Sequence, residues 1–407
     1  MHIGILTGGG DCPGLNAVIR AVTLALINEA GARVSGLERG FLGLIERRAR
    51  PLDAAAVAGI LAQGGTILGT HNRADPFHYF GAGGADVSAQ ALAFARELGL
   101  DGLVAIGGDG TMDIAHRLSL LGLPVVGVPK TIDNDLPHTE RSFGFDSAVA
   151  VVAEALDRLA TTARSHGRVM VCETMGRYAG WIALEGGIAG GADVILLPER
   201  PCSVAAVAAR CREREVDGGC TLVCVAEGTR LDGGALTLRQ TLPDSPDPLR
   251  LGGVAAALTA QLQGLLSSEV RHTQLGHVQR GGAPTPFDRV LATRFGWHAA
   301  QLVRQRQWGR MVTLQGGEIS SVALDQVAGQ SRPVPDGHPL LAAAQGLGLC
   351  LGGAAALPWR CRSAERHHVQ RHSRRARSGG APLSRRCGCA RAPPRGAARR
   401  QRRRPGC

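Results

Sequence analysis

The sequence has few aromatic residues, a single lysine and no cysteine framework. Phe, Trp and Tyr make up 3% of the 407 residues, and Lys130 is the one lysine among 46 basic residues. The 11 cysteines are an odd number without regular spacing, which excludes a disulfide-stabilised secreted fold and favours free thiols in a reducing cytoplasm. Cys387 and Cys389 have no second ligand pair at a suitable spacing, so we do not expect a zinc site there.

The sequence also lacks a recognisable secretion leader. Met1 and His2 run directly into the apolar segment 3–7, without a charged leader or a cleavage site. One uncharged run, 340–359, is long enough to cross a bilayer, but it is rich in Gly and Ala and contains Gln345. We therefore predict that this run forms a C-terminal helix followed by a strand, and we expect a cytoplasmic protein with no membrane partner.

Positive charge is concentrated at one end of the chain. The formal net charge is +12, yet residues 353–407 contain 16 arginines and a single acid, Glu365. The first 352 residues therefore carry 30 basic and 33 acidic groups, a net charge of −3. An overall basic charge would suggest nucleic acid as a partner, but here the charge belongs to a tail and not to the body of the protein.

The arginine-rich tail, 353–407, has no apolar periodicity with which to bury a core, so we expect it to be disordered. Its arginines could neutralise nucleic-acid phosphates. However, Trp359 is its one aromatic residue, and it contains no recognisable binding module. Nucleic-acid binding is thus a remote alternative. We favour a neutral extension or an out-of-frame translation of a GC-rich gene, which would have this Arg, Ala, Gly, Pro and Cys composition.

Apolar strand-like runs alternate with helical patterns and Gly-rich turns in the first 352 residues, a rhythm typical of parallel α/β sheets. The length suggests two domains, and ligands of such sheets bind beyond the carboxyl ends of the strands. The patterning predicts strands over 3–7, 102–106, 125–128, 168–173 and 192–197. It predicts helices over 16–29, 91–98, 112–120 and 147–163.

The first of three motifs, residues 7–16 (TGGGDCPGLN), directly follows a predicted strand and opens a helix. Consecutive glycines let backbone N–H groups approach an anion closely, and the N-terminus of a helix adds a favourable dipole. These features favour phosphate binding, although a simple Gly-rich turn has the same composition. No Gly-Lys-Ser/Thr follows, so the motif is not a Walker loop.

The second motif, residues 106–111 (IGGDGT), also lies at the end of a predicted strand. The carboxylate of Asp109 among backbone donors suits Mg²⁺, which usually takes one or two carboxylates together with phosphate oxygens of a substrate. The alternative is a turn closed by an Asx hydrogen bond. Two such loops after two strands strengthen the phosphate-binding interpretation of each.

The third motif, residues 129–135 (PKTIDND), places two carboxylates, Asp133 and Asp135, two residues apart after a predicted strand. One carboxylate can accept a hydroxyl proton while the other helps to hold a metal ion. Lys130 lies here as well, and a compact ammonium in a chain that otherwise uses arginine indicates a phosphate site. A surface lysine without a role is the alternative.

Together these motifs resemble the 6-phosphofructokinase family, and three further motifs continue the match in the family's order. They are residues 173–177 (ETMGR), 226–228 (AEG) and 275–282 (LGHVQRGG). Gly-Gly-Asp-Gly-Thr alone also occurs in NAD kinases and lipid kinases, but the six motifs together are specific, and the resemblance covers about residues 1–352. It implies an α/β protein with two Rossmann-like parallel-sheet sandwich domains and the active site in the cleft between them.

The resemblance also implies how the chain divides. Residues 1–140 would form the phosphoryl-donor domain, to which part of 255–310 returns, and residues 141–255 would form the sugar-phosphate domain. Residues 311–352 would add C-terminal helices and a strand before the tail. A homodimer or homotetramer is implied, because Arg168 and Arg271 would reach the sugar phosphate from a neighbouring subunit.

By position in the motifs, the resemblance implies in-line phosphoryl transfer to the 1-hydroxyl of fructose 6-phosphate, as in glycolysis. Asp133 would take the hydroxyl proton, and Thr131 would support the transferring group. Asp109 and Asp135 would organise Mg²⁺ as the cofactor, and Arg177 would neutralise charge in the transition state. The phosphoryl donor would contact Gly10, Arg73, Gly108, Asp109, Gly110, Thr111 and Lys130. The sugar phosphate would contact Arg168, Met175, Gly176, Arg177, Glu227, Arg271, His277 and Arg280.

Two positions bear on the choice of phosphoryl donor. Gly110 leaves room for the α-phosphate and nucleoside of ATP, where pyrophosphate-dependent relatives usually carry an Asp. Lys130 replaces the Gly of ATP-dependent bacterial enzymes and resembles the pyrophosphate-dependent group. Because a carboxylate would block the space that Gly110 leaves open, we expect an ATP-dependent 6-phosphofructokinase, with pyrophosphate as the alternative donor. The loop 68–76, which carries Arg73, is one residue longer than the family's usual form.

Overall fold

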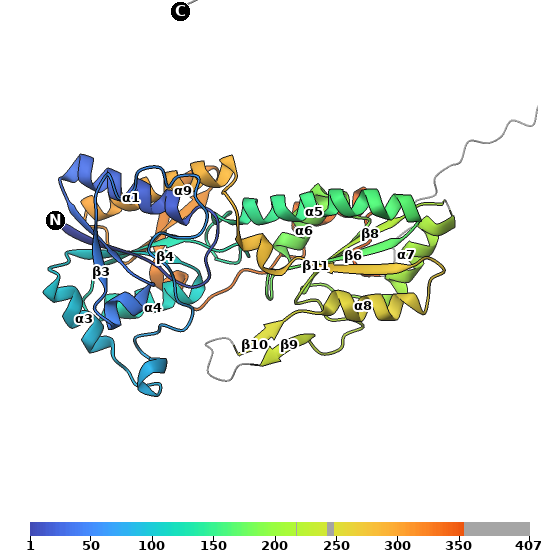
Figure 1. Cartoon of the computed structure of the whole chain (residues 1–407), viewed down its shortest axis with the longest axis horizontal. Coiled ribbons are helices and arrows are strands. Elements are labelled where there is room, and N and C mark those ends of the chain that lie inside the picture. Colours follow the sequence, from blue (N-terminus) through green and yellow to red (C-terminus); the bar gives the residue numbers. More distant parts are fainter. Residues whose placement is uncertain (217, 242–247, 354–407) are drawn as a thin grey trace, which may run out of the picture. The chain divides into compact units, whose positions relative to one another are not determined.

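The computed structural model describes residues 1–216, 218–241 and 248–353, all within one compact unit. Figure 1 shows two sheets in this unit, each with helices on both of its faces. The expectations for the arginine-rich tail, which were disorder and a remote possibility of nucleic-acid binding, concern residues 354–407 and lie outside the described residues.

The first sheet is mostly parallel. Its strands, in spatial order, are β13 (Glu318–Ala323), β12 (Arg310–Gln315), β5 (Val125–Pro129), β4 (Gly102–Gly107), β1 (His2–Thr7), β2 (Arg33–Leu37) and β3 (Ala49–Leu52). The two edge strands, β3 and β13, run antiparallel to their neighbours. Strands β1, β4 and β5 are buried along their whole length, because helices cover both faces, and this is why they read as continuous apolar runs.

Helices from both ends of the chain cover the first sheet (Figure 1). One face carries α1 (Leu15–Ala30) and α9 (Pro286–Arg304), and the other carries α3 (Ser88–Glu97), α4 (Asp109–Leu120) and the short α2 (Phe41–Ile45). Gly296 lets α9 approach α1 closely, since a Cβ at this position would lie 2.7 Å from the Cβ of Ala21. The chain therefore returns to the first sheet late in the sequence, through α9, β12 and β13.

The second sheet is entirely parallel. Its strands, in spatial order, are β11 (Val270–Gln274), β6 (Val169–Thr174), β8 (Thr221–Ala226) and β7 (Val194–Leu196). One face is covered by α5 (Phe145–His166) and α6 (Trp181–Ala189), and the other by α7 (Val204–Val216) and α8 (Val254–Gln263). A hairpin of β9 (Leu238–Thr241) and β10 (Leu249–Leu251) and the helix α10 (Pro339–Gly346) complete the second half, together with the 3₁₀ turn η2 (Gly276–Arg280).

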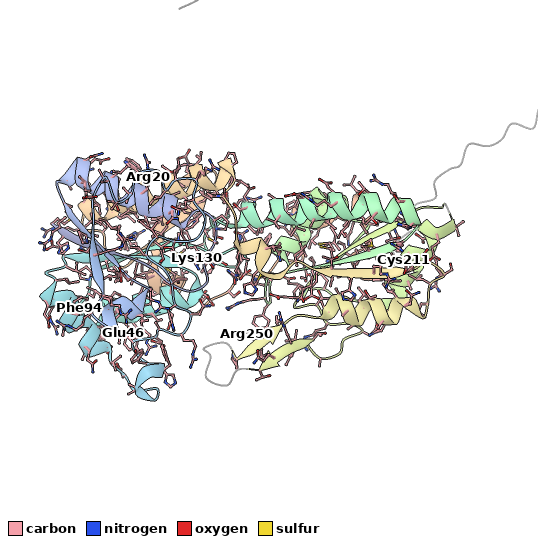
Figure 2. The ribbon with its side chains drawn as sticks, in the orientation of Figure 1. Arg20, Glu46, Phe94, Lys130, Cys211 and Arg250 are labelled. Carbon is pink, nitrogen blue, oxygen red and sulfur yellow. The ribbon has the colours of Figure 1, made fainter. Side chains whose placement is uncertain are left out.

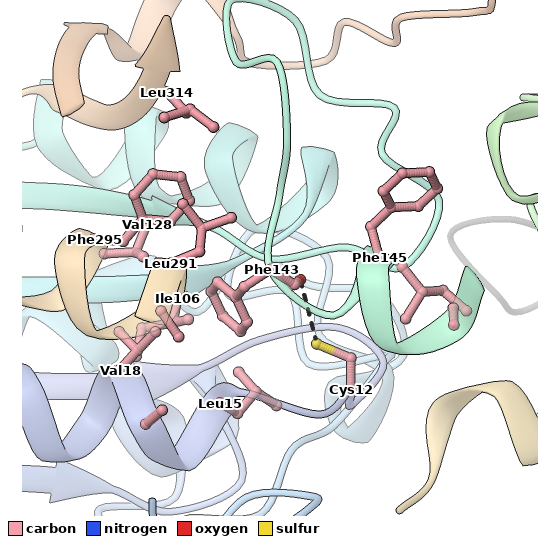
Figure 3. Close-up of a cluster of buried hydrophobic side chains, with 14 of the residues drawn as sticks. Cys12, Leu15, Val18, Ile106, Val128, Phe143, Phe145, Leu291, Phe295 and Leu314 are labelled. Carbon is pink, nitrogen blue, oxygen red and sulfur yellow. Dashed lines mark hydrogen bonds between the residues drawn. The ribbon is translucent and has the colours of Figure 1, made fainter. Parts of the chain in front are cut away.

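Buried apolar side chains join the loops of the candidate site to the first sheet. Phe143, which is fully buried, lies near Cys12 and Leu15 at the start of α1, and the Sγ of Cys12 donates to the carbonyl of Phe143 at 3.7 Å (Figure 3). Gly14 makes room for this ring, since a Cβ there would lie 2.7 Å from an edge carbon of Phe143. The packing fixes the chain after β5 against the loop after β1.

The structure confirms the α/β class with predominantly parallel sheets, and the strands and helices predicted over residues 3–197 all form. Two helices begin three residues earlier than predicted, and one of them is α3, which begins at Ser88 and not at residue 91. Helix α4 begins at Asp109 and not at residue 112, so the second motif lies on its first turn. The run 340–359 begins with α10 as predicted, but the strand after it is reduced to an isolated bridge between Cys350 and Val194 within the described residues. In the described part of the chain, every helix is too short or too polar to traverse a bilayer.

The segments near the expected domain boundaries contribute to both sheets. Within the range 255–310, β11 belongs to the second sheet whereas α9 returns to the first. Within 311–352, β12 and β13 form an edge of the first sheet, and Cys350 contacts β7 of the second. The division into a donor domain and a sugar-phosphate domain stays a prediction.

Candidate active site

Three loops follow the carboxyl ends of β1, β4 and β5, which are neighbours in the first sheet. The amide of Gly8, after β1, donates to the carbonyl of Ile106 at 2.8 Å, and the amide of Lys130, after β5, donates to the carbonyl of Gly107 at 2.9 Å. These bonds hold the three motifs together at the edge of the sheet where parallel α/β proteins bind ligands.

The helices that follow two of these loops also begin at this edge. Helix α1 follows Gly14 and helix α4 follows Gly108, and no side chain of the described residues caps either helix. The first-turn amides and the helix dipoles therefore favour an anion at this edge. A carboxylate in the first turn is favoured for the same reason, which explains why α4 starts as early as Asp109.

Glycines shape the space at the start of α4. A Cβ on Gly8 would lie 2.5 Å from Oγ1 of Thr111, a buried residue of the first turn, so this close packing requires glycine. Gly110 is different, since a Cβ there would meet no described atom within 4 Å. The expected room beside Gly110 is therefore present.

The loop after β5 contains the candidate base. Asp133 and Thr131 are 5% and 7% exposed, and the amide of Asp133 donates to Oγ1 of Thr131 at 3.0 Å. Oδ1 of Asp133 is buried and has no hydrogen-bond partner among the described residues. An unpaired buried carboxylate oxygen is unfavourable, so this atom is placed to accept a proton or a hydrogen bond from a ligand.

Three carboxylates interact electrostatically at this edge of the sheet. Burial, and then the charges of Asp133 and Asp109, raise the pKa of Asp135 to about 7, while a hydrogen bond with Thr131 opposes the rise. The described residues thus gather negative charge that a cation would stabilise.

Lys130 brings positive charge to the same loops. It is 3% exposed, and its Nζ donates to the carbonyl of Gly10 in the loop after β1. Burial is the main cause that lowers the pKa of its ammonium, and the charge of Asp133 opposes this effect. Figure 2 shows Lys130 where the strands of the first sheet end, on the side toward the second sheet. Lys130 therefore contacts the Gly-rich loop of the first motif, and its role as a donor ligand stays a prediction.

A second group of candidate residues follows β6 and β8 of the second sheet. Gly176 has φ 137°, and a Cβ there would lie 2.5 Å from the carbonyl oxygen of Ala179, so the turn requires glycine. The amide of Arg177 donates to Oε1 of Glu227 at 3.1 Å. Burial raises the pKa of Glu227 to about 7, and the charge of Asp133 contributes.

The turn η2 connects the two groups. Nη1 of Arg280 donates to the carbonyl of Asp11 at 3.3 Å, and a Cβ on Gly10 would lie 2.9 Å from the same nitrogen. Arg280, on the chain segment after β11, therefore reaches the loop after β1. His277 lies on the same turn and is exposed.

Gln279 is a site residue to which the motifs assign no role. It is fully buried, its Oε1 accepts from the amide of Met175 at 3.3 Å, and its Nε2 donates to the carbonyl of Gly276 at 3.0 Å. It thus fixes the Met175 turn to η2. Its position between two candidate phosphate ligands, His277 and Arg280, is the signal by which the sequence could have revealed it.

Two candidate residues, Arg168 and Arg271, are not brought to this group, and a third, Arg73, contacts an aromatic side chain. Arg168 precedes β6 while Met175 follows it, and a six-residue strand separates its ends by about 20 Å. Arg168 and Arg271 both pair with Glu269 at the start of β11. The guanidinium of Arg73 lies over the ring of Phe80, 5.0 Å from its centre. That Arg168 and Arg271 act on a neighbouring subunit stays a prediction.

The residues also fit a divalent cation of the kind that phosphoryl transfer generally uses. Within residues 1–216, 218–241 and 248–353, no cluster of three or more His, Cys, Asp or Glu side chains is arranged to hold a metal ion by itself. Mg²⁺ does not need such a cluster, because it usually binds through one or two carboxylates, water and substrate phosphates. The carboxylates of Asp109 and Asp135, which influence each other electrostatically, would provide suitable oxygen ligands.

Comparison with known proteins assigns this arrangement to a family. The family model described as phosphofructokinase matches residues 2–303. A protein of Clostridium perfringens described as ATP-dependent 6-phosphofructokinase 2 is 46% identical over 355 residues, which cover 85% of this chain and 97% of that protein. The chain belongs to the phosphofructokinase family. The resemblance of the six motifs is thereby confirmed over the body of the chain.

Members with different donors are similar to this chain. A protein of Amycolatopsis methanolica described as pyrophosphate–fructose 6-phosphate 1-phosphotransferase is 48% identical over 335 residues, covering 82% of this chain and 96% of that protein. The crystal structure of a pyrophosphate-dependent phosphofructokinase from Marinobacter aquaeolei matches with a TM-score of 0.71 at 22% identity, covering 86% of this chain and 88% of that one. The structural match shows the shared fold alone.

Proposed function

We propose that the chain transfers the γ-phosphoryl group of ATP to the 1-hydroxyl of fructose 6-phosphate, giving fructose 1,6-bisphosphate and ADP. The observation that carries the proposal is the buried, unpartnered Oδ1 of Asp133 in the loop after β5. Membership in the phosphofructokinase family supports the reaction class.

Asp133 acts as the general base. The 1-hydroxyl oxygen forms a new bond to the γ-phosphorus, and its proton passes to Oδ1 of Asp133. The bond from the γ-phosphorus to the bridging oxygen breaks, and its electron pair leaves with ADP. Thr131, whose Oγ1 accepts from the amide of Asp133, keeps the carboxylate in position beside the transferring group.

Fixed positive charge and helix amides stabilise the transferring group. Arg177 neutralises negative charge that develops in the transition state, while Lys130 and the amides around Gly10 and Gly108 hold the donor phosphates. On the other side of the site, Glu227, Met175 and Gly176 contact the sugar. The 6-phosphate pairs with His277 and Arg280, and Arg-to-phosphate pairing suits the fork of a guanidinium.

Asp109 and Asp135 are the residues that would hold Mg²⁺. When bound, this ion would reduce the negative charge of the donor phosphates. We further propose that the enzyme acts in the cytoplasm as a homodimer or homotetramer in which Arg168 and Arg271 complete the sugar-phosphate site of a neighbour.

Lys130 favours a second candidate function, in which pyrophosphate replaces ATP as the donor. Its ammonium reaches the carbonyl of Gly10, and a relative that uses pyrophosphate by its description is 48% identical. The open space beside Gly110 favours ATP instead, because a nucleoside needs that room. We give the steric argument more weight, since a cation can serve either donor.

The direct test is an assay of the full chain with fructose 6-phosphate, Mg²⁺ and either ATP or pyrophosphate. Formation of fructose 1,6-bisphosphate with ATP supports the proposal, turnover with pyrophosphate alone would reverse the donor assignment, and turnover with neither would exclude both. Asp133→Ser should lower kcat by about 10²- to 10⁴-fold, the range of general base catalysis, and leave sugar binding largely intact. Asp75→Ser, which removes a carboxylate from the loop 68–76, is the control and should retain activity.

A further inference from the structure

The loop that carries Asp133 and Asp135 has no regular structure of its own. Residues 131–135 lie outside any helix or strand. Asn134, between the two carboxylates, has φ 53°, a left-handed backbone conformation that is uncommon for residues other than glycine. Such a conformation persists only where the surroundings hold it. Its supports are therefore part of the catalytic arrangement.

Arg332, from the segment between β13 and α10, provides one such support. Its backbone amide donates to the carbonyl of Asp135 at 2.6 Å, and its Nη2 donates to the carbonyls of Asn134 at 2.7 Å and Glu140 at 3.2 Å. One residue thus binds both ends of the turn that follows Asp133. Because the guanidinium donates to carbonyls, it leaves Oδ1 of Asp133 without a partner among the described residues.

Arg332 is itself held in place by the sugar side of the site. Its guanidinium lies 4.6 Å from the centre of the Trp181 ring, and Nε1 of Trp181 donates to the carbonyl of Arg332 at 3.0 Å. Trp181 begins α6, directly after the turn of Gly176 and Arg177. Two residues beyond Arg332, the amide of Val334 donates to the carboxylate of Glu199, which also accepts from the amide of Gly180.

The loop 131–135 borders a cavity, so it needs the support that Arg332 provides. A cavity of about 320 Å³ is lined by Asn134, Arg332, Trp181 and His338, among others. Without the guanidinium, the turn at Asn134 could relax into this space, and the carboxylate of Asp133 would move with it. Misplacement of a reacting group by about 1 Å can cost about 100-fold in rate.

We propose that Arg332 is a positioning residue for phosphoryl transfer, which fixes the Asp133–Asp135 loop relative to the Gly176–Arg177 turn. The inference rests on the proposed function, because that function assigns the base, Asp133, and one metal ligand, Asp135, to this loop. Arg332 touches neither substrate in this proposal. Its effect is on the geometry in which the 1-hydroxyl meets Asp133.

Steady-state kinetics of Arg332→Ala, Arg332→Lys and Arg310→Ala test the inference. Arg310 is the matched control, because its guanidinium also donates to a backbone carbonyl, that of Ser321, but on β12 and β13 away from the loop. Arg332→Ala should lower kcat about 100-fold and leave the KM for fructose 6-phosphate within about threefold, as expected for a group that is misplaced and not lost. Arg332→Lys, which keeps the charge but not the fork, should recover part of the loss.

Free guanidinium at a low, non-denaturing concentration should restore part of the activity of Arg332→Ala and none to Arg310→Ala. Equal losses in Arg310→Ala and Arg332→Ala, or a loss that appears only as unfolding at the assay temperature, would overturn the inference. Hydrogen exchange measured by mass spectrometry gives a readout that needs no turnover. Arg332→Ala should speed exchange in peptides that cover 131–142, and unchanged exchange there would overturn the inference even if the wild-type chain used neither donor.

Discussion

Gly110 stands on the first turn of α4, where the absence of a side chain decides what fits beside it. A Cβ would meet no described atom within 4 Å, while the neighbouring Asp109 and Thr111 are both candidate ligands of the donor. A carboxylate added there would extend into the space proposed for the α-phosphate and would repel it. Pyrophosphate has no group at that place, so it would be affected less.

Gly110→Asp should therefore lower kcat/KM for ATP by about 100-fold or more, the scale of an unpaired like charge of about 3 kcal/mol, and should affect pyrophosphate less. The measurement is the ratio of kcat/KM for the two donors in the wild type and the variant. Gly337→Asp is the matched control, because a Cβ at Gly337 also meets open space, on a segment before α10. An equal loss for both donors would contradict the steric argument.

The sequence reveals candidate functional residues where a short motif groups side chains of a recognisable chemistry. Asp133 and Lys130 stand out because a carboxylate pair and a unique lysine follow a strand directly. Arg332 does not stand out, since its role depends on contacts with residues almost 200 positions earlier in the chain. Gln279 lies inside a recognised motif, yet only the structure shows that its amide bonds the Met175 turn.

At the scale of elements, burial on both faces made the strands easy to predict. Strands β1, β4, β5 and β6 are mostly apolar runs that were predicted from the sequence, whereas β8 is equally buried but was not predicted. The start of α4 was harder, because Asp109, Gly110 and Thr111 are weak helix formers in isolation. Their helical conformation depends on the packing of Thr111 against Gly8 and on the helix dipole. The pairing of β11 with β6 is a contact over about 100 residues, which local patterns do not encode.

The start of α5 depends on a buried carboxylate from α9. Oδ2 of Asp288, which is fully buried, accepts from the amide of Ser147 at 2.8 Å and from its hydroxyl at 2.6 Å. Burial raises the pKa of Asp288 to about 6, although these hydrogen bonds oppose the rise. The folded chain therefore keeps this proton at pH values where the unfolded chain, near the ordinary 3.8, has released it.

This carboxyl should make the protein less stable as the pH rises. Its stabilising contribution is complete below about pH 4 and is lost through about pH 6, and two pKa units correspond to about 3 kcal/mol. Urea unfolding of the wild type and of Asp288→Asn between about pH 4 and about pH 7 measures it. The wild type should lose about 3 kcal/mol relative to the variant over this range. Asp157→Asn, on the exposed side of α5, is the control, and a parallel course of all three curves would contradict the assignment.

For the whole molecule, the distribution of charge separates the enzyme from its tail. Residues 1–352 carry a net charge of −3, and the 16 arginines that make the chain basic follow them. The positive charge proposed to act in the reaction is local: Lys130, Arg177 and Arg280 near the proposed site, and Arg168 and Arg271 beyond it. These last two lie at the start of β6 and β11, and β11 is an edge strand of the second sheet.

An edge strand with exposed backbone groups is a natural place for a second subunit to cover, and Arg271 on β11 is 61% exposed. If each site combines Asp133 of one subunit with Arg271 of its neighbour, two inactive variants should complement each other. Co-expression of Asp133→Ser with Arg271→Ala should then restore about a quarter of wild-type activity, because half of randomly assorted dimers are hybrids and each hybrid has one intact site of two.

The site that is intact in the hybrid belongs to the Arg271→Ala subunit, which keeps its own Asp133 and receives Arg271 from its neighbour. Asp133→Ser with Asp109→Ala is the control pair. Both residues would contribute to the same site from the same subunit, so no site of a hybrid dimer can be complete. Activity is measured on purified mixed oligomers with ATP and fructose 6-phosphate. Recovery no greater than the mean of the two parent variants would mean that the sugar-phosphate site is built within a single chain.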